Sequence, residues 1–245
     1  MITIERNARK AAVFAAFLLL LGTSAAALAS VNVSPVLLEM SDSRDRDVVR
    51  VTNSSGVAKS FEVNAVAWSQ SDQDREIYND TDEILAVPPL FTLQPGQTQV
   101  VRIGVMRPAD ATTELAYRVF FTELAPPETS DETSGVNMRL RFGIPVFVAP
   151  TAPARSAVEL VKSATAGNQT AVQLRNNGNV RVKVIEIRYF ASPGSAPEVT
   201  PTVFYLHPGM TGYLPVDIPG ENATGTLELF TDTAGVLTYV LAELE

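Results

Sequence analysis

Four arginines lie in runs that alternate apolar and polar residues, and arginines in such positions can bind anions. Arg102 is in TQVVRIGVM, Arg118 is in AYRVFFTEL, and Arg139 and Arg141 are in GVNMRLRFGIPVFVAP. A guanidinium group binds a carboxylate through two parallel charge-assisted hydrogen bonds, so arginines that face a cleft could hold a carboxylate. The alternative is that they are the solvated outward positions of surface strands.

Other reactive side chains offer less. The single histidine, His207, stands in the turn-like stretch LHPG, where we expect an exposed structural side chain rather than a catalytic base. A histidine metal site would need a second histidine. The sequence has no cysteine, which excludes thiolate zinc sites and cysteine catalysis, and it has no glycine-rich phosphate loop. We therefore expect no metal and no cofactor.

Carboxylates cluster between Asp72 and Glu83. The spacing of Asp72, Asp74 and Glu76 is similar to that of an oxygen-ligand calcium loop, but the glycine and the closing glutamate of that motif are missing. A solvated hairpin loop explains the cluster better. Nothing places two carboxylates in one cleft, as glycoside hydrolysis would require.

The first 29 residues are typical of an export signal. Arg6, Arg9 and Lys10 precede an apolar stretch at residues 11–21 that is too short to span a bilayer, and Ala-Leu-Ala at residues 27–29 is a cleavage site. We exclude this segment from the fold, and no other apolar run is long enough to span a membrane. Removal of the signal leaves 216 residues, enough for two small domains.

Charge argues against a polyanionic partner. Without the signal, the 19 basic and 27 acidic residues of the chain fall to 16 and 26, a net charge of −10. A nucleic acid or an anionic membrane is therefore not an expected partner.

Short apolar runs separated by turn residues recur along the chain and indicate an all-β fold. Alternation with period two is typical of half-buried strands, and no convincing amphipathic helix interrupts it. The spacing favours a β-sandwich. The expected strands cover residues 48–53, 61–68, 98–106, 116–124, 135–150, 171–176, 180–190, 202–206, 212–218, 225–230 and 237–244.

An internal repeat favours two sandwich domains over one large barrel. A strand ends at Asn53 before a glycine and another ends at Asn176 before a glycine, and later strands follow LQPG at 93–96 and LHPG at 206–209. Pro-Gly fits the central positions of a type II turn. We expect domains at 30–150 and 151–245, joined by a stiff Pro/Ala segment that fixes their angle and leaves a cleft between them.

The run at residues 135–150 has one apolar and one basic face. Pro145 cannot donate to a sheet ladder, so we expect this strand at a sheet edge or bulged there. A long apolar edge invites pairing with another chain. The acidic, proline-bearing loop at 125–134 would let the start of the strand project.

Three stretches together resemble the periplasmic pilus chaperones, the PapD-like family of chaperone–usher pathways. They are VPPLFTLQPGQTQVVRIGVMRP (87–108), AYRVFFTELAPP (116–127) and GVNMRLRFGIPVFVAP (135–150). The resemblance runs over nearly all of the mature chain, and LRFGIPVFV together with the lack of cysteine resembles the archaic branch. It implies two immunoglobulin-like β-sandwich domains set as an L, a periplasmic location, a role in pilus assembly (fimbrium biogenesis) and no enzymatic activity.

The resemblance also implies a mechanism and two partners, pilus subunits and an outer-membrane usher. A pilus subunit lacks the last strand of its own sandwich, and the chaperone lends it the last strand of its first domain, which is donor-strand complementation. The usher then exchanges that strand for one from the next subunit. The unpaired edge leaves self-association of the free form open. The lending positions share one face of the strand: Val136, Met138, Leu140, Phe142 and Ile144.

One departure from the family concerns the residues that hold the carboxylate at the subunit's C-terminus. In most members these are an arginine of the first strand and a lysine late in the lending strand. The two positions fall near Val36–Leu37 and on Pro145, and neither is basic. We expect the substitute among the strand arginines, first Arg102 and Arg118, then Arg139 and Arg141.

A second family feature is a set of ion pairs between the domains. Glu123 and Asp232 match its acidic members, but its arginine falls on Ala149. Arg155 would stand in, or packing would hold the angle of the domains.

Two other classes of function are open. An exported adhesive or carbohydrate-binding β-sandwich would need an aromatic platform, and Trp68 is the only tryptophan. A hydrolase on a β scaffold would need an acid/base site, and none is visible in the sequence.

Overall fold

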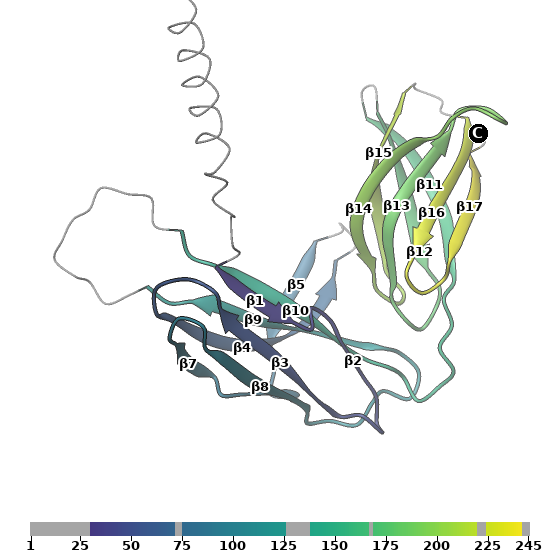
Figure 1. Cartoon of the computed structure of the whole chain (residues 1–245). Helices are drawn as coiled ribbons and strands as arrows, with labels where there is room; N and C mark the ends of the chain where they lie inside the picture. The colour runs from purple at the N-terminus through teal and green to yellow at the C-terminus, as the bar shows by residue number, and fades with distance from the viewer. Residues whose placement is uncertain (1–29, 72–74, 126–137, 167–168, 220–223, 242–245) are drawn as a thin grey trace, which may run out of the picture.

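The computed structural model describes residues 30–71, 75–125, 138–166, 169–219 and 224–241, and every regular element in these ranges is a β-strand (Figure 1). The predicted export signal and most of the predicted acidic loop lie outside the described residues. Within the described ranges, no helix has the length and apolar character needed to cross a bilayer.

The first sandwich consists of two sheets. One has the strand order β1-β3-β8-β6 and the other the order β2-β10-β9-β4-β5, with β7 also paired to β4. The strands are β1 (Val31–Ser34), β2 (Leu38–Met40), β3 (Arg46–Asn53), β4 (Lys59–Gln70), β5 (Glu76–Asp80), β6 (Ile84–Val87), β7 (Leu90–Leu93), β8 (Thr98–Val105), β9 (Leu115–Glu123) and β10 (Arg141–Val148).

The second sandwich also has two sheets. Their orders are β11-β12-β15 and β14-β13-β16-β17. The strands are β11 (Val158–Ala166), β12 (Gln169–Asn176), β13 (Val182–Phe190), β14 (Glu198–Leu206), β15 (Thr211–Pro219), β16 (Gly225–Thr231) and β17 (Val236–Leu241). The all-β prediction with two sandwich domains is confirmed.

Alternation along the strands produces each core. In β3, Val49 and Val51 are buried while Arg50 between them is exposed. In the second sandwich, Leu227 and Leu229 of β16 are fully buried in the same way. Each sandwich thus has its own hydrophobic cluster, as expected for two layers that pack face to face.

The repeat seen in the sequence is a repeated connection in the structure. In the first sandwich, the buried Asn53 amide donates from Nδ2 to the carbonyls of Val57 (2.7 Å) and Leu93 (3.1 Å). The N–H of Gly96 donates to the carbonyl of Asn53 at 2.8 Å. The φ of Gly96 is +77°, as the third residue of a type II turn requires.

The second sandwich repeats these bonds. Nδ2 of the buried Asn176 donates to the carbonyls of Val180 and Leu206, each at 2.9 Å. The N–H of Gly209, whose φ is +75°, donates to the carbonyl of Asn176 at 2.8 Å. One buried asparagine therefore joins the last residue of a strand to the loop that follows the asparagine in each domain.

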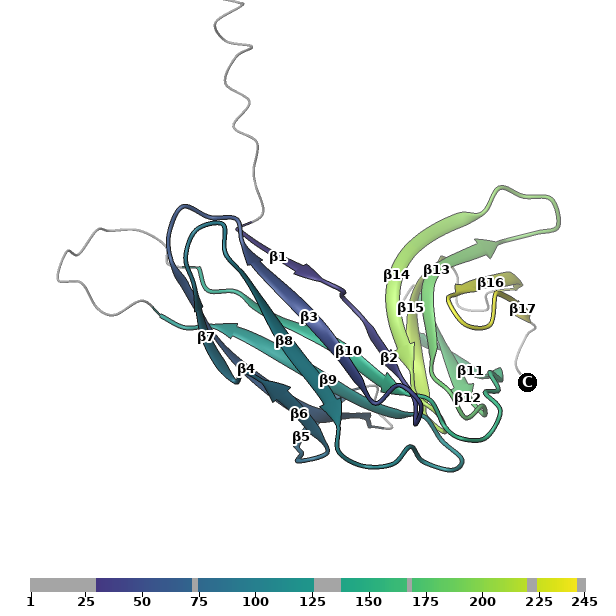
Figure 2. The same cartoon turned by 60° about the horizontal axis from the view of Figure 1, so that its bottom comes forward.

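The sandwiches meet at one end and stand at an angle, as Figure 2 also shows. β10 ends at Val148 and β11 begins at Val158. The connection between them is tied to the first sandwich, because the N–H groups of Thr151 and Ala152 donate to the carbonyls of Asp110 and Ala111, each at 3.0 Å. This restricts the swing of the second domain.

Candidate functional site

β10 is paired along its whole length on one side and only at its end on the other. β9 pairs with residues 141–148, whereas β2 pairs with residues 146–148 alone, in parallel. Residues 141–145 therefore have one edge that no strand of the described residues pairs with. Pro145, which has no N–H to donate, lies in this open part, and the β9–β10 register runs through it without a bulge.

The inward face of β10 belongs to the core of the first domain. Ile144, Val146 and Val148 are buried there. Phe142 is half-buried and stacks on Phe121, with ring centroids 5.1 Å apart and 10° between the planes. The later positions of the predicted lending face are thus covered by the chain itself.

The residues before β10 are more open. Met138 is 82% exposed and Leu140 is half-buried. The carbonyl of Leu140 accepts a hydrogen bond from the N–H of Glu123 at 2.8 Å, which continues the pairing with β9 by one residue. The predicted strand starts at residue 135, but regular pairing starts only at Arg141; Val136 lies outside the described residues.

The outward face of the same sheet carries arginines stacked on aromatic rings. The guanidinium carbon of Arg118 in β9 lies 3.9 Å from the ring centre of Trp68 in β4 and 5.4 Å from that of Tyr78 in β5. Arg118 also forms an ion pair with Glu76, with Nη1 and Oε2 3.1 Å apart. Tyr78 donates to Glu76 and accepts from Arg118.

Arg141 extends this arrangement along β10. Its guanidinium carbon lies 4.2 Å from the ring centre of Phe120, and Phe120 meets Tyr78 edge-to-face at 5.3 Å. Gly143 makes room for the packing, since a Cβ there would lie 2.7 Å from Cδ of Arg118 and 2.8 Å from the Phe120 ring. Any larger residue at 143 would displace Arg118.

The electrostatics of this face favour an anion. Burial, with a hydrogen bond to Glu76, raises the pKa of Tyr78 to about 12, so its hydroxyl stays neutral. Glu76 pairs with Arg118, whereas Arg141 has no ion pair within the described residues. Nε of Arg118 is buried and has no hydrogen-bond partner among the described residues. The arrangement can bind a carboxylate through charge-assisted hydrogen bonds.

Two of the predicted anchor arginines lie elsewhere. Arg102 is exposed on β8, between the buried Val101 and Ile103, so it points outward from the other sheet of the first sandwich. The structure therefore does not bring Arg102 together with Arg118. Arg139 is exposed and precedes β10.

The carboxylates of the predicted hairpin loop have separate partners. Asp72 and Asp74 lie outside the described residues. Glu76 binds Arg118, and Glu83 accepts hydrogen bonds from Arg107 and Tyr117, each at 2.7 Å. These bonds lower the pKa of Glu83, and the bond from Tyr117 contributes most. Among the described residues, no group of acidic and histidine side chains could hold a metal ion.

The structure does not bring the predicted interdomain residues together; each of the three has its contacts within one domain. Glu123 pairs with Lys59 within the first domain, at the end of β9 far from the junction. Asp232 is exposed, and its N–H donates to the carbonyl of Lys183 in the same domain. Arg155 binds the carbonyl of Asn177 through Nη2 at 2.7 Å, again within one domain.

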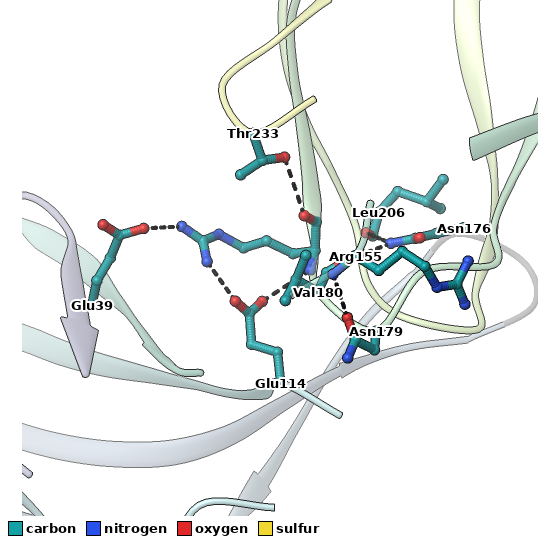
Figure 3. A network of polar contacts seen from close by, with 9 residues as sticks. Glu39, Glu114, Arg155, Asn176, Asn179, Val180, Leu206 and Thr233 are labelled. Atoms are coloured by element: carbon teal, nitrogen blue, oxygen red, sulfur yellow. Dashed lines mark hydrogen bonds and ion pairs between the residues drawn. The ribbon is translucent and has the colours of Figure 1, made fainter. Parts of the chain in front are cut away.

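The junction is held instead by Arg181, which precedes β13. Figure 3 labels its two partners, Glu39 and Glu114. Nη1 lies 2.7 Å from Oε2 of Glu114 and Nη2 lies 2.6 Å from Oε1 of Glu39, both in the first domain. Its guanidinium carbon lies 3.8 Å from the ring centre of Phe147 in β10. The sequence analysis missed Arg181, because no feature of VRVKVIEIRYF distinguishes it from an arginine at a solvent-exposed strand position.

A second contact between the domains surrounds His207, which is buried rather than exposed as its turn-like sequence suggested. Its ring packs edge-to-face on Trp68, with ring centroids 4.5 Å apart. The backbone N–H of His207 donates to Oε1 of Gln70 at 2.8 Å. Tyr205 packs on the same tryptophan at 5.2 Å. Burial, together with the charges of Arg118 and Arg181, lowers the pKa of His207 to about 4.

Comparison with known proteins identifies a family. Residues 30–154 match the family described as "Pili and flagellar-assembly chaperone, PapD N-terminal domain". No curated protein matches the chain by sequence.

Solved structures share the fold. A chain of the CsuC–CsuE chaperone–tip adhesion subunit pre-assembly complex, from archaic Csu pili of Acinetobacter baumannii, is similar with a TM-score of 0.67 and 16% identity, over 89% of this chain and 100% of that one. A chain of the Salmonella enterica SafA pilin complex with the SafB chaperone has a TM-score of 0.62 and 18% identity, over 87% of this chain and 97% of that one. The class 5 fimbriae chaperone CfaA has a TM-score of 0.58 and 15% identity, over 87% of this chain and 100% of that one.

Proposed function

The chain belongs to the pilus and flagellar-assembly chaperones with a PapD N-terminal domain, and we propose that it binds and caps pilus subunits in the periplasm by donor-strand complementation. It would hold each subunit until an outer-membrane usher replaces the lent strand with one from the next subunit. The better fit of the replacement strand would drive release. The exchange needs no chemical step by this chain.

The observation that carries this proposal is the unpaired edge of β10 at residues 141–145, which continues into the open segment with Met138 and Leu140. A sheet edge offers a row of backbone donors and acceptors to a further strand. Alternate apolar side chains ahead of β10 would fill the groove of the incomplete subunit. Phe142 and Ile144 lie on the same face of the strand and pack in the core of the first domain. They would connect that core to the core of the bound subunit.

Burial of three side chains supplies a useful free energy. At about 1.5–3 kcal/mol each, Val136, Met138 and Leu140 would contribute about 5–9 kcal/mol before the cost of ordering the segment. That is enough to stabilise a subunit that lacks one strand.

We place the carboxylate anchor at Arg118, with Arg141 beside it. Both lie on the outward face of the sheet to which β10 belongs, and Arg118 is held in place by Trp68 and Glu76. Arg139, exposed ahead of β10, would approach the bound subunit from the same side. This replaces the basic residues that the family usually has near Val36 and at Pro145.

The partners follow from the same features. CsuC–CsuE and SafA–SafB are complexes of a chaperone with a pilus subunit, which supports a pilin as the partner here. The predicted export signal supports a periplasmic location. The free edge of β10 would also favour self-association when no subunit is bound.

The test is subunit retention by Leu140→Glu and Met138→Glu variants, co-expressed with a pilus subunit and purified from periplasm. Both variants should fold and lose the subunit, because a buried carboxylate in the groove has no partner. Val57→Glu is the matched control, since Val57 is 65% exposed in a turn away from β10. Full retention by the Leu140 and Met138 variants would contradict strand lending, and binding of the protein to a sugar column instead would favour a carbohydrate-binding module.

A further inference from the structure

The outward face of the sheet β1-β3-β8-β6 is basic, although the chain is acidic. In β3 and β8, the residues that alternate with the buried core positions point to solvent, and they include Arg46, Arg50 and Arg102. The outward positions of all four strands include no aspartate or glutamate. The outward strand positions thus carry only positive charge, although Asp45, which directly precedes β3, lies 3.5 Å from Nε of Arg46.

Two of these arginines have no partner among the described residues. Arg107, Arg118 and Arg181 each bind a carboxylate of the chain itself. By contrast, Arg50 and Arg102 make neither an ion pair nor a hydrogen bond within the part of the chain that the structure describes. Their hydrogen-bonding capacity is free for an external anion.

The arginines have a regular spacing. Arg102 in β8 lies opposite Val48 in β3, midway between Arg46 and Arg50. Measured along the strand direction, the backbone positions of the three arginines therefore follow one another at intervals of two residues, about 7 Å, with Arg102 one strand to the side. An extended polypeptide places its same-face side chains at the same interval. Carboxylates at every second position of an extended segment would match the three arginines.

Aliphatic side chains border the arginines on one side. Leu85 and Val87 of β6 are 51% and 41% exposed, and Val87 lies opposite Arg102. Arginine beside exposed aliphatic surface is typical of protein interfaces. The outward positions carry no aromatic residue and no lysine, and the chain as a whole is acidic, which argues against an anionic membrane as the occupant.

We propose that this face, formed by Arg46, Arg50, Arg102, Leu85 and Val87, is a docking surface for an extended acidic segment of a partner protein. The segment would place carboxylates on the arginines and apolar flanking residues on β6. The surface lies on the opposite side of the first sandwich from Arg118, so it can be occupied together with the β10 edge. It is independent of strand lending.

The probe is a fluorescent peptide in which glutamate alternates with threonine, compared by anisotropy with a glutamine version and with a peptide of the same composition whose glutamates are contiguous. We expect the alternating peptide to bind most tightly. Arg50→Glu and Arg102→Glu should each weaken its binding about tenfold, because an attraction becomes a repulsion. Arg175→Glu, an exposed site in the second domain with the same change of net charge, should leave binding unchanged.

Circular dichroism will verify that each variant is folded, and Arg102→Gln serves as a milder substitution that should weaken binding less than the reversal. Four results would overturn the proposal. They are equal binding of the glutamine peptide, equal weakening by Arg175→Glu, no weakening by Arg50→Glu and Arg102→Glu, and binding of phosphatidylglycerol vesicles in preference to the alternating peptide.

Discussion

Arg181 and Glu114 form a buried ion pair that joins the two domains. Nη1 of Arg181 lies 2.7 Å from Oε2 of Glu114, and the N–H of Arg181 donates to Oε1 at 3.0 Å. The two side chains are 4% and 5% exposed. Because a buried charge that loses its partner is costly, this pair favours one angle between the sandwiches.

Arg181→Ala should therefore destabilise the protein. The change leaves the Glu114 carboxylate buried without a counter-ion, and we expect the free energy of unfolding to fall by about 3–5 kcal/mol. Urea titration measures the loss. Arg175→Ala is the control, since Arg175 is exposed. The double variant Arg181→Met with Glu114→Gln should recover part of the loss, and an equal loss in the control would show that the pair has no special role.

The equivalent asparagines predict equal effects in the two domains. Asn53→Ala and Asn176→Ala each remove two hydrogen bonds from a buried side-chain amide to backbone carbonyls, so each should cost about 1–3 kcal/mol. Calorimetry can assign each loss to its own domain. Asn32→Ala, at an exposed position of β1, should have little effect. A loss confined to one domain for both variants would refute the equivalence.

Acid should weaken the domain junction through His207. The folded-state pKa is about 4 and the ordinary value is 6.5, so the folded protein favours the neutral ring. Stability from this residue is complete above pH 6.5 and is lost as the pH falls towards 4, because the unfolded chain binds the proton more readily. Between pH 7 and about pH 4.5 the loss should be of the order of 2 kcal/mol.

The measurement is urea unfolding at both pH values for the wild type and for His207→Gln. The variant should lose less stability than the wild type over this range, because its side chain does not titrate. Identical pH dependence of the two proteins would mean that His207 does not titrate with a lowered pKa.

The anchor proposal is tested at Gly143 as well as at Arg118. Arg118→Ala should reduce subunit recovery, and Gly143→Val should do the same by displacing the Arg118 stem, which a Cβ would approach to 2.7 Å. Gly104→Val is the matched control, since a Cβ at this strand glycine meets nothing within 4 Å. Wild-type recovery with Arg118→Ala would move the anchor to another residue.

Much of the fold could be predicted from the sequence because its signals are local. The alternation of Val49, Arg50 and Val51 indicated a strand with a buried and an exposed face, and the structure has both. The turns before Gly96 and Gly209 followed from Pro-Gly chemistry alone. Such inferences need only neighbouring residues.

The site was harder to predict. Alternation places Arg102 and Arg118 on outward positions, but it does not indicate from which of the two sheets each side chain projects. The structure puts Arg118 beside Trp68 and sends Arg102 to the opposite face of the sandwich. The composition of LHPG suggested an exposed His207, yet the first domain covers it.

The amino-acid sequence by itself determined many of the strands, although not β1, β2, β5, β6, β7 and β11. It also determined the two-fold repeat of the sandwich and the apolar edge ahead of Pro145, since these depend on side-chain period and turn chemistry. Only the tertiary structure decided that Arg181 joins Glu114 across 67 positions of the chain and that Glu123 pairs with Lys59 instead of crossing the junction. The physical reason is that an ion pair depends on distance in space, which the relative placement of two packed domains sets.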